Sequence, residues 1–170
     1  MGVDAAAVAV EEARRRARER GARNVRFEEA DARDLSAFPA GRFDAVVLAD
    51  LVEHVVDEVL APALAEAARV LVPGGLLALY TPNRDHWAER VKAAVPGLQQ
   101  RDHVAVRRSA EVVSLVSAAG FAVSDLFFSA SPYPLLGAVD RAFPSLALCR
   151  FRTCLRAVTP APGASGPSGP

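Results

Sequence analysis

The chain has 170 residues, 51% of them hydrophobic, so it can form one domain with a sizeable core but is short for two. Its 20 basic residues balance its 20 acidic ones, which argues against broad electrostatic binding of nucleic acid or anionic lipid. No stretch approaches the roughly 20 apolar residues that span a bilayer, and the N-terminus lacks the basic flank of a signal peptide. We therefore expect a cytoplasmic protein without stable membrane insertion.

The first quarter of the chain predicts a helix, a strand and a loop. Residues 5–20 are rich in Ala, Glu and Arg, and Gly21 follows as a helix terminator. Apolar residues then alternate over 24–28, which predicts a strand with one exposed face. Residues 31–42 contain charges, a proline and a glycine and are expected to be a loop.

The rest of the chain continues the alternation of strands and helices. The run 43–48 is continuously apolar and predicts a buried strand of a parallel sheet. A helix is expected over 60–72, stopped by Pro73-Gly74-Gly75, and a strand over 76–80. Ser109 has the character of an N-cap for a helix that Gly120 ends, and 121–128 predicts a further strand.

This order predicts an α/β fold, a sheet with helices on both faces. We expect one domain over residues 1–158 and a disordered Pro/Gly/Ser tail over 159–170. Cys149 and Cys154 have no nearby partner residues for zinc and are expected to be reduced thiols. No spacing of ligand residues predicts a metal site.

Several segments, taken in order, carry a family resemblance. They are Gly2-Val3-Asp4 before a helix, residues 29–35 and 42–55, Arg69-Val70-Leu71-Val72-Pro73-Gly74-Gly75, and Ala119-Gly120-Phe121. Together they resemble the class I S-adenosylmethionine (SAM)-dependent methyltransferases, in the group that includes the quinone-biosynthesis enzymes. The resemblance covers residues 2–128. It implies a Rossmann-like methyltransferase sheet and SAM as the cofactor.

The resemblance also implies cofactor-binding residues. Asp4 would bind the ribose hydroxyls, as an acidic residue at a strand end can; the alternative is a cap for the helix that follows. Asp31 would accept a hydrogen bond from the adenine amino group and the Ala32 backbone N–H would meet a ring nitrogen, with Asp34 as a rival to Asp31.

A second set follows the strand at 43–48. Ala49, Asp50 and Leu51 lie where α/β sheets bind ligands and, by the resemblance, would flank the amino acid part of SAM. Glu53 and His54 could instead simply cap the next helix and form a salt link.

Methyl transfer from a sulfonium is an in-line displacement that mainly requires alignment of the acceptor with the methyl group. A base is needed where the acceptor is a weakly acidic hydroxyl or an amine, and histidine suits that role. Of the three histidines, His54 and His103 are the candidates, each of them equally open to a structural role.

One part of the family pattern is missing. The family fold begins with a strand, a GxGxG-type loop and a helix, and none of these precedes Gly2. That strand would lie between the strand ending at Asp4 and the one at 43–48, which therefore should have no shared neighbour. We expect an N-terminally truncated methyltransferase domain, with a degenerate domain as the alternative.

The function expected is methyl transfer to the O, C or N atom of a small-molecule acceptor. The apolar segment 127–148 could be a lid over an apolar acceptor, although an ordinary helical cap is the simpler interpretation. Two alternatives remain open: a non-catalytic α/β domain that binds a nucleotide or a partner protein, and an NAD-binding Rossmann domain.

Overall fold

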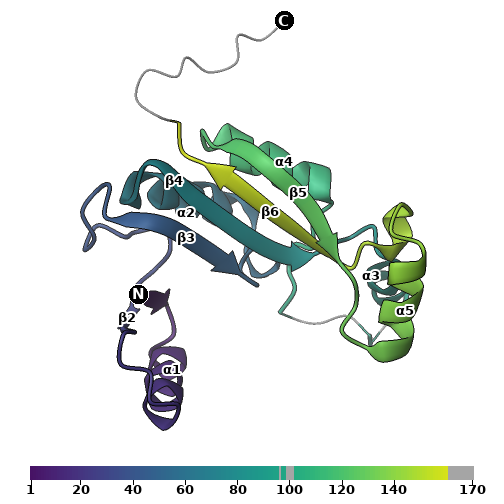
Figure 1. Cartoon of the computed structure of the whole chain (residues 1–170), viewed down its shortest axis with the longest axis horizontal. Helices are drawn as coiled ribbons and strands as arrows, with labels where there is room; N and C mark the ends of the chain where they lie inside the picture. The colour runs from purple at the N-terminus through teal and green to yellow at the C-terminus, as the bar shows by residue number, and fades with distance from the viewer. Residues whose placement is uncertain (96, 99–101, 161–170) are drawn as a thin grey trace, which may run out of the picture.

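The computed structural model of the protein describes residues 1–95, 97–98 and 102–160. Figure 1 shows their arrangement. The helices are α1 (Ala7–Glu19), α2 (Asp57–Val70), α3 (Trp87–Ala94), α4 (Ser109–Ala118) and α5 (Pro134–Ala142), with short 3₁₀ turns η1 (Val52–His54) and η2 (Ala147–Cys149). The strands are β1 (Gly2–Asp4), β2 (Phe27–Glu29), β3 (Phe43–Ala49), β4 (Leu71–Pro82), β5 (Ala122–Ser129) and β6 (Arg152–Val158).

The strands form two separate sheets. β1 and β2 pair in parallel, and β3, β4, β6 and β5 form a second sheet in that order. The small sheet and α1 lie apart from the larger one, on the side of β3 (Figure 1). The prediction that the strands ending at Asp4 and spanning 43–48 share no neighbour is therefore confirmed.

Strand β6 was not predicted from the sequence. It runs antiparallel to both β4 and β5 and fills the space between them. Thr153, Leu155 and Ala157 point to the buried face and alternate with more exposed residues. The larger sheet is thus mixed, with β3 parallel to β4.

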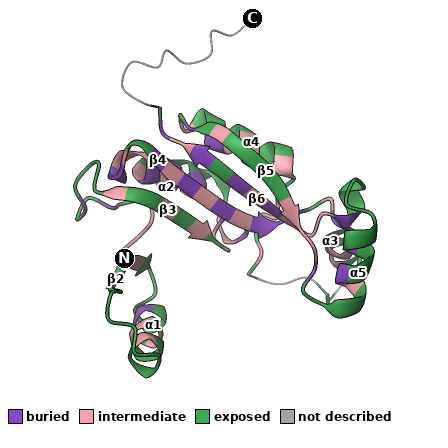
Figure 2. Cartoon of the chain, in the orientation of Figure 1, coloured by how far each residue is buried: buried purple, intermediate pink, exposed green. Residues whose placement is uncertain are grey.

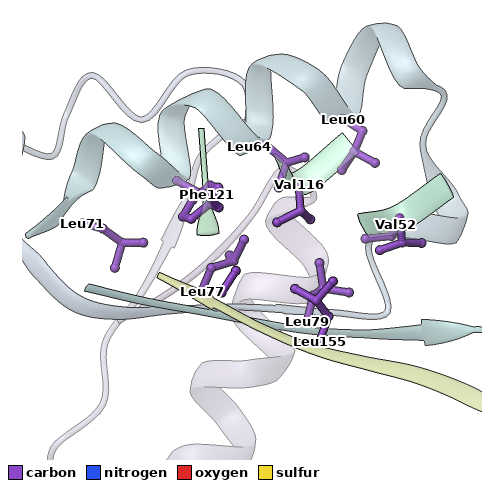
Figure 3. Packing of buried hydrophobic residues seen from close by; sticks show 12 residues of the cluster. Val52, Leu60, Leu64, Leu71, Leu77, Leu79, Val116, Phe121 and Leu155 are labelled. Atoms are coloured by element: carbon purple, nitrogen blue, oxygen red, sulfur yellow. The ribbon is translucent and has the colours of Figure 1, made fainter. Parts of the chain in front are cut away.

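The hydrophobic core lies on one face of the larger sheet. Leu60 and Leu64 of α2 and Val116 of α4 pack there against Leu77 of β4 and Leu155 of β6 (Figure 3). Each of these side chains is at most 2% exposed. Burial of such a side chain contributes about 1.5–3 kcal/mol, so this layer fixes the sheet under α2 and α4.

The opposite face of the larger sheet is open. Val47 is 64% exposed and Phe127 51% exposed. In Figure 2 purple residues alternate with pink or green ones along β4 and β6, whereas β3 and β5 are pink and green throughout. Among the described helices, α2 and α4 pack on the core side and α1 packs on the small sheet. The expectation of helices on both faces is therefore wrong for the larger sheet of the described chain.

Hydrogen bonds connect the loop 31–42, which follows the small sheet, to α2. Arg69 donates hydrogen bonds to the carbonyl oxygens of Leu35 and Phe38, and Glu66 accepts one from the Leu35 backbone N–H. A cavity of about 720 Å³, whose lining includes Met1 and Phe43, lies between the small sheet and the start of β3. These hydrogen bonds therefore hold the loop 31–42 against α2, and Phe38 and Arg42 of the same loop line the cavity.

Several predicted boundaries shift by a few residues. β2 begins at Phe27, after the predicted start at Asn24. α2 begins at Asp57 and contains Pro62 as its sixth residue, where the missing N–H leaves the Glu58 carbonyl without its usual donor inside the helix. It ends at Val70, before Pro73, and β4 begins at once.

Two terminal assignments also change. Ser109 is the first residue of α4 rather than its cap: Arg108 occupies the cap position, and its N–H donates to Glu111. Thr159, assigned to the tail, is 7% exposed and hydrogen-bonds to Gly75, so it belongs to the domain. Residues 161–170 of the predicted tail lie outside the described residues. Among the described helices, none has the length and hydropathy needed to cross a bilayer.

Candidate functional site

Asp4 ends β1 and its side chain caps the turn that follows. Its Oδ1 accepts a hydrogen bond from the Ala6 N–H at 2.8 Å, and its carbonyl accepts one from Ala30 of the neighbouring segment. The residue is exposed at the strand end. The capping role is therefore present, and the exposed position leaves the carboxylate accessible to a ligand hydroxyl.

Asp31 and Ala32 follow β2 on the surface. Both oxygens of Asp31 accept from the Arg33 side chain, and Oδ1 also accepts from the Arg33 N–H. These hydrogen bonds lower the pKa of Asp31 to about 2. Asp34 instead accepts from the Ser36 N–H. Asp31 is thus a fixed, ionised acceptor, and an adenine amino group would have to share it with Arg33.

Asp50 follows β3 and has a strained backbone. Its φ is 49°, and among the described residues Asp50 is the only non-glycine residue with a positive φ. This backbone conformation costs energy and is common at functional sites. Tyr80 Oη donates to Asp50 Oδ2 at 3.0 Å, and Arg152 binds the other carboxylate oxygen. Ala49 and Leu51 flank it, with Ala49 exposed.

Glu53 is 1% exposed and does not cap α2, whose N-cap is Val56. Its Oε2 accepts a hydrogen bond from Thr81 Oγ1 at 2.8 Å. Burial raises the pKa of Glu53 above its ordinary value, and the nearby carboxylate of Asp50 adds to the effect. The alternative interpretation, a helix cap with a salt link, is therefore wrong for Glu53, which is a buried acid in the described chain.

His54 and His103 come together although they are far apart in the chain. Their rings meet edge to face with centroids 4.9 Å apart, and His54 Nδ1 lies 2.8 Å from the Asp102 carbonyl oxygen. Glu53, His54 and His103 each offer a ligand atom, and these atoms lie within 4.8 Å of one another. The two candidate bases therefore form one cluster with a carboxylate.

The third histidine is structural. His86 is fully buried, its Nε2 lies 3.1 Å from Asp140 Oδ1 on α5, and its Nδ1 accepts from the Ala88 N–H to cap α3. It joins α3 to α5, where the apolar segment 127–148 forms its helix. This segment keeps Leu135 84% exposed and Tyr133 64% exposed.

Sequence reasoning missed the residues that hold Asp50 and Glu53. Tyr80 and Thr81 lie at the end of β4 and Arg152 at the start of β6. The run of apolar residues before Tyr80 signalled a strand, and polar side chains at its carboxyl end were the available sign of a site. Arg152 gave no such sign, because the chain contains many arginines.

Comparison with known proteins agrees with this arrangement. Residues 1–75 match the family model described as a methyltransferase domain. No curated protein matches the chain.

The solved structures with similar folds share little sequence with the chain. The [4+2]-cyclase SpnF is 21% identical with a TM-score of 0.69, and the chain covers 94% of itself and 65% of SpnF. A SAM-dependent methyltransferase of Thermotoga maritima, described as a possible histamine N-methyltransferase, is 19% identical with a TM-score of 0.70, over 94% of this chain and 72% of that one. A structure of the Haloferax volcanii Trm112 methyltransferase activator in complex with a methyltransferase is 20% identical with a TM-score of 0.68. The match covers 94% of this chain and 71% of that one.

The chain thus spans about two thirds of the length of these proteins. Their sequence identities are low enough that they establish the fold alone, whereas the family model matches the segment containing Asp4, Asp31 and Asp50. Residues 1–75 thus match a methyltransferase domain, and the chain has the fold of SAM-dependent methyltransferases.

Proposed function

We propose that the protein, when its nucleotide site is complete, transfers a methyl group from SAM to a small-molecule acceptor. The observation that carries this proposal is the placement of Asp4, Asp31 and Asp50 at or within two residues of the carboxyl ends of three strands of a methyltransferase fold. Ligands of open α/β sheets bind at the carboxyl ends of such strands. In this assignment Asp4 binds ribose, Asp31 and the Ala32 N–H bind adenine, and the 49–51 segment flanks the amino acid part.

The reaction needs little chemistry from the protein. The acceptor atom attacks the methyl carbon, the carbon–sulfur bond breaks, and its electron pair stays on sulfur, which becomes the thioether of S-adenosylhomocysteine. An O or N acceptor loses a proton, which an imidazole at the 54/103 cluster can accept. The chain's own residues therefore align the acceptor and receive its proton.

Only the chemical class of the acceptor is proposed. The exposed apolar side chains of the α5 segment, including Leu135 and Phe143, support an apolar small molecule. The balanced charge of the chain supports an acceptor other than nucleic acid. We also propose a cytoplasmic location, from the sequence alone.

Calorimetric titration with SAM tests the proposal. The chain contains no GxGxG loop, so residues 1–170 should bind SAM weakly. A fusion that places the strand, glycine loop and helix of a methyltransferase of the same fold before Met1 should bind SAM at least about 100-fold more tightly, a difference of about 2.7 kcal/mol. Equally weak binding by both proteins would favour the alternative, a non-catalytic α/β domain.

Turnover provides the second part of the test. The fusion protein is incubated with SAM and a panel of phenols, amines and quinols, and S-adenosylhomocysteine is quantified. Acceptor-dependent product supports methyl transfer. Tight SAM binding without product for any acceptor would restrict the function to cofactor binding.

A further inference from the structure

The cluster formed by Glu53, His54 and His103 has the composition of a metal site. Two imidazoles and one carboxylate offer ligand atoms that all lie within 4.8 Å of one another. Ligands of a single zinc-sized ion, each about 2.1 Å from it, are separated by at most about 4.2 Å. A small rotation of the partly exposed His103 side chain would close this difference.

We propose that Glu53, His54 and His103 bind a divalent transition-metal ion. This set of two nitrogens and one oxygen suits Zn²⁺, Fe²⁺, Co²⁺ or Mn²⁺ rather than Ca²⁺ or Mg²⁺, which prefer oxygen ligands. Three protein ligands leave coordination positions open, as in catalytic rather than structural zinc sites. The open positions would accept water or an oxygen atom of a second ligand, and an imidazole could take a proton from the methyl acceptor only in the metal-free protein.

The hydrogen bond of His54 prepares its other nitrogen for a metal. A carbonyl oxygen can only accept, so the 2.8 Å contact with the Asp102 carbonyl places the ring proton on His54 Nδ1. Nε2 then carries the free lone pair. Ligating histidines usually donate their second nitrogen to a carbonyl or carboxylate in this way, which fixes the ring and its tautomer.

The segment that carries His103 is tied to the turn that carries the other two residues. Ala105 donates its N–H to the carbonyl oxygen of Glu53 at 3.0 Å, and the Asp102 carbonyl receives the bond from His54. Both ties flank His103 in the chain. The approach of His103 to His54 is therefore held by the backbone and does not depend on the two rings alone.

The negative charge of an ionised Glu53 has no cationic partner among the described residues. Within the described part of the chain it forms no ion pair, and its neighbour Asp50 is already bound by Arg152 and Tyr80. Thr81 satisfies Oε2 with a hydroxyl, which carries no charge. Because burying a carboxylate without a cation is costly, a divalent ion at this point would stabilise the ionised form.

Titration with Co²⁺ tests the site without any need for methyl transfer. Low-coordinate Co²⁺ bound by imidazole absorbs visible light, so its spectrum reports the ligands directly, and calorimetry with Zn²⁺ gives the stoichiometry. We expect one ion per chain. His54→Gln and His103→Gln should each weaken binding by about 100-fold or more and change the Co²⁺ spectrum.

Asp125→Asn is the matched control for charge, because Asp125 is an exposed carboxylate on β5 outside the cluster. It should bind Co²⁺ as the unaltered chain does, whereas Glu53→Gln should bind it weakly. His103 lies on a partly exposed connection, so His103→Gln should keep the circular dichroism of the folded chain. The proposal is overturned if the unaltered chain binds no Co²⁺, or if both histidine variants bind it with an unchanged spectrum.

This outcome is independent of the proposed methyl transfer. A protein that binds Co²⁺ through these residues but produces no S-adenosylhomocysteine would keep the metal site and lose the proposed function. Conversely, the fusion protein could transfer the methyl group in chelator, and do so with His103→Gln as well, while no Co²⁺ binds. That result would keep the proposed function and remove the metal site.

Discussion

Arg152 at the start of β6 binds the carboxylate of Asp50 after β3, although β4 lies between the two strands. Its guanidinium crosses the Tyr80 ring of β4, 5.0 Å from the ring centre. The ionic contact thus joins three strands at one end of the sheet. It fixes the side chain of Asp50, whose backbone is left-handed and whose carboxylate lies close to Glu53.

Replacing Arg152 should reveal the strength of this contact. Burial alone would raise the pKa of Asp50, but the hydrogen bonds from Arg152 and Tyr80 outweigh it and leave the pKa below its ordinary value. Because Asp50 is 41% exposed, solvent screening limits the loss in Arg152→Met to about 1 kcal/mol of unfolding free energy. Urea denaturation at neutral pH measures it.

Arg156→Met is the control, since Arg156 lies on the same strand and face but faces Asp125 at 3.8 Å with both groups exposed. Stability from a carboxylate with a lowered pKa is present above the unfolded pKa and is lost as pH falls through the folded one. The difference between the two variants should therefore shrink below about pH 3.8, the ordinary Asp value. A constant difference across this range would show that Arg152 acts by packing alone.

Glu53→Gln should stabilise the metal-free protein at neutral pH. Burial raises the pKa of Glu53, so the folded state holds the proton more tightly than the unfolded state and loses stability as pH rises through the raised pKa. Gln keeps an acceptor for Thr81 and avoids the charge. With a chelator present, thermal unfolding should show a higher Tm for the variant at pH 7–8 and no gain below about pH 4.5, the ordinary Glu value.

The same thermal unfolding measurement can contradict this prediction for Glu53→Gln. A lower Tm for Glu53→Gln at pH 7–8 in chelator would mean that Glu53 is ionised and compensated there by the protein itself. Thr81→Val provides the matched change on the partner, and it should lower the Tm because Glu53 would lose its hydrogen bond.

The sequence predicted the local elements better than the contacts between them. The runs 43–48 and 76–80 lie inside β3 and β4 because continuous apolar stretches signal buried parallel strands. β6 escaped prediction because its buried positions hold the moderately hydrophobic Thr153 and Ala157, between arginines. A strand of that composition is stabilised by its two neighbours rather than by its own sequence.

In the candidate site, too, the sequence predicted single residues better than the contacts between them. His54 and His103 were selected singly by their chemistry, whereas their approach depends on how the 102–105 segment folds back on η1. The pairing of Arg152 with Asp50 joins residues 102 positions apart, which no local pattern encodes. Ion pairs within one helix need no such folding: in α1 Glu12 pairs with Arg16, and Arg15 pairs with Glu12 and Glu19.

Two substitutions of Asp4 separate its cap from its proposed role in ribose binding. Asp4→Asn keeps an oxygen that can accept from the Ala6 N–H, whereas Asp4→Ala loses it at a cost of about 1 kcal/mol of stability. Both remove the charge that would strengthen hydrogen bonds to ribose. In the fusion protein with a glycine loop, Asp4→Ala should weaken SAM binding by about 2–4 kcal/mol, and Asp4→Asn by a smaller amount.

Calorimetry gives the SAM affinities, and thermal denaturation gives the stabilities. Lower stability of Asp4→Ala with unchanged SAM affinity would assign Asp4 to capping alone. Arg23→Ala serves as a control for a charge change in the exposed loop between α1 and β2, and it should alter neither quantity by more than about 0.5 kcal/mol.

The open sheet face should make the 170-residue chain prone to self-association. Val47 and Phe127 are 64% and 51% exposed on that face, and Ala45 and Ala49 lie beside Val47 on the same side of β3. β3 is also an edge strand, with β4 as its neighbour and no second partner among the described strands. An exposed apolar face beside an unpaired edge recruits other chains.

Size-exclusion chromatography should show mixed oligomers, and thermal unfolding should be broad. Val47→Lys should shift the profile towards monomer, because a charge at the edge blocks strand pairing, while Val8→Lys, on the exposed side of α1 at 82% exposure, should leave it unchanged. A monodisperse monomer with a sharp transition for the unaltered chain would show that the open face is stable in water.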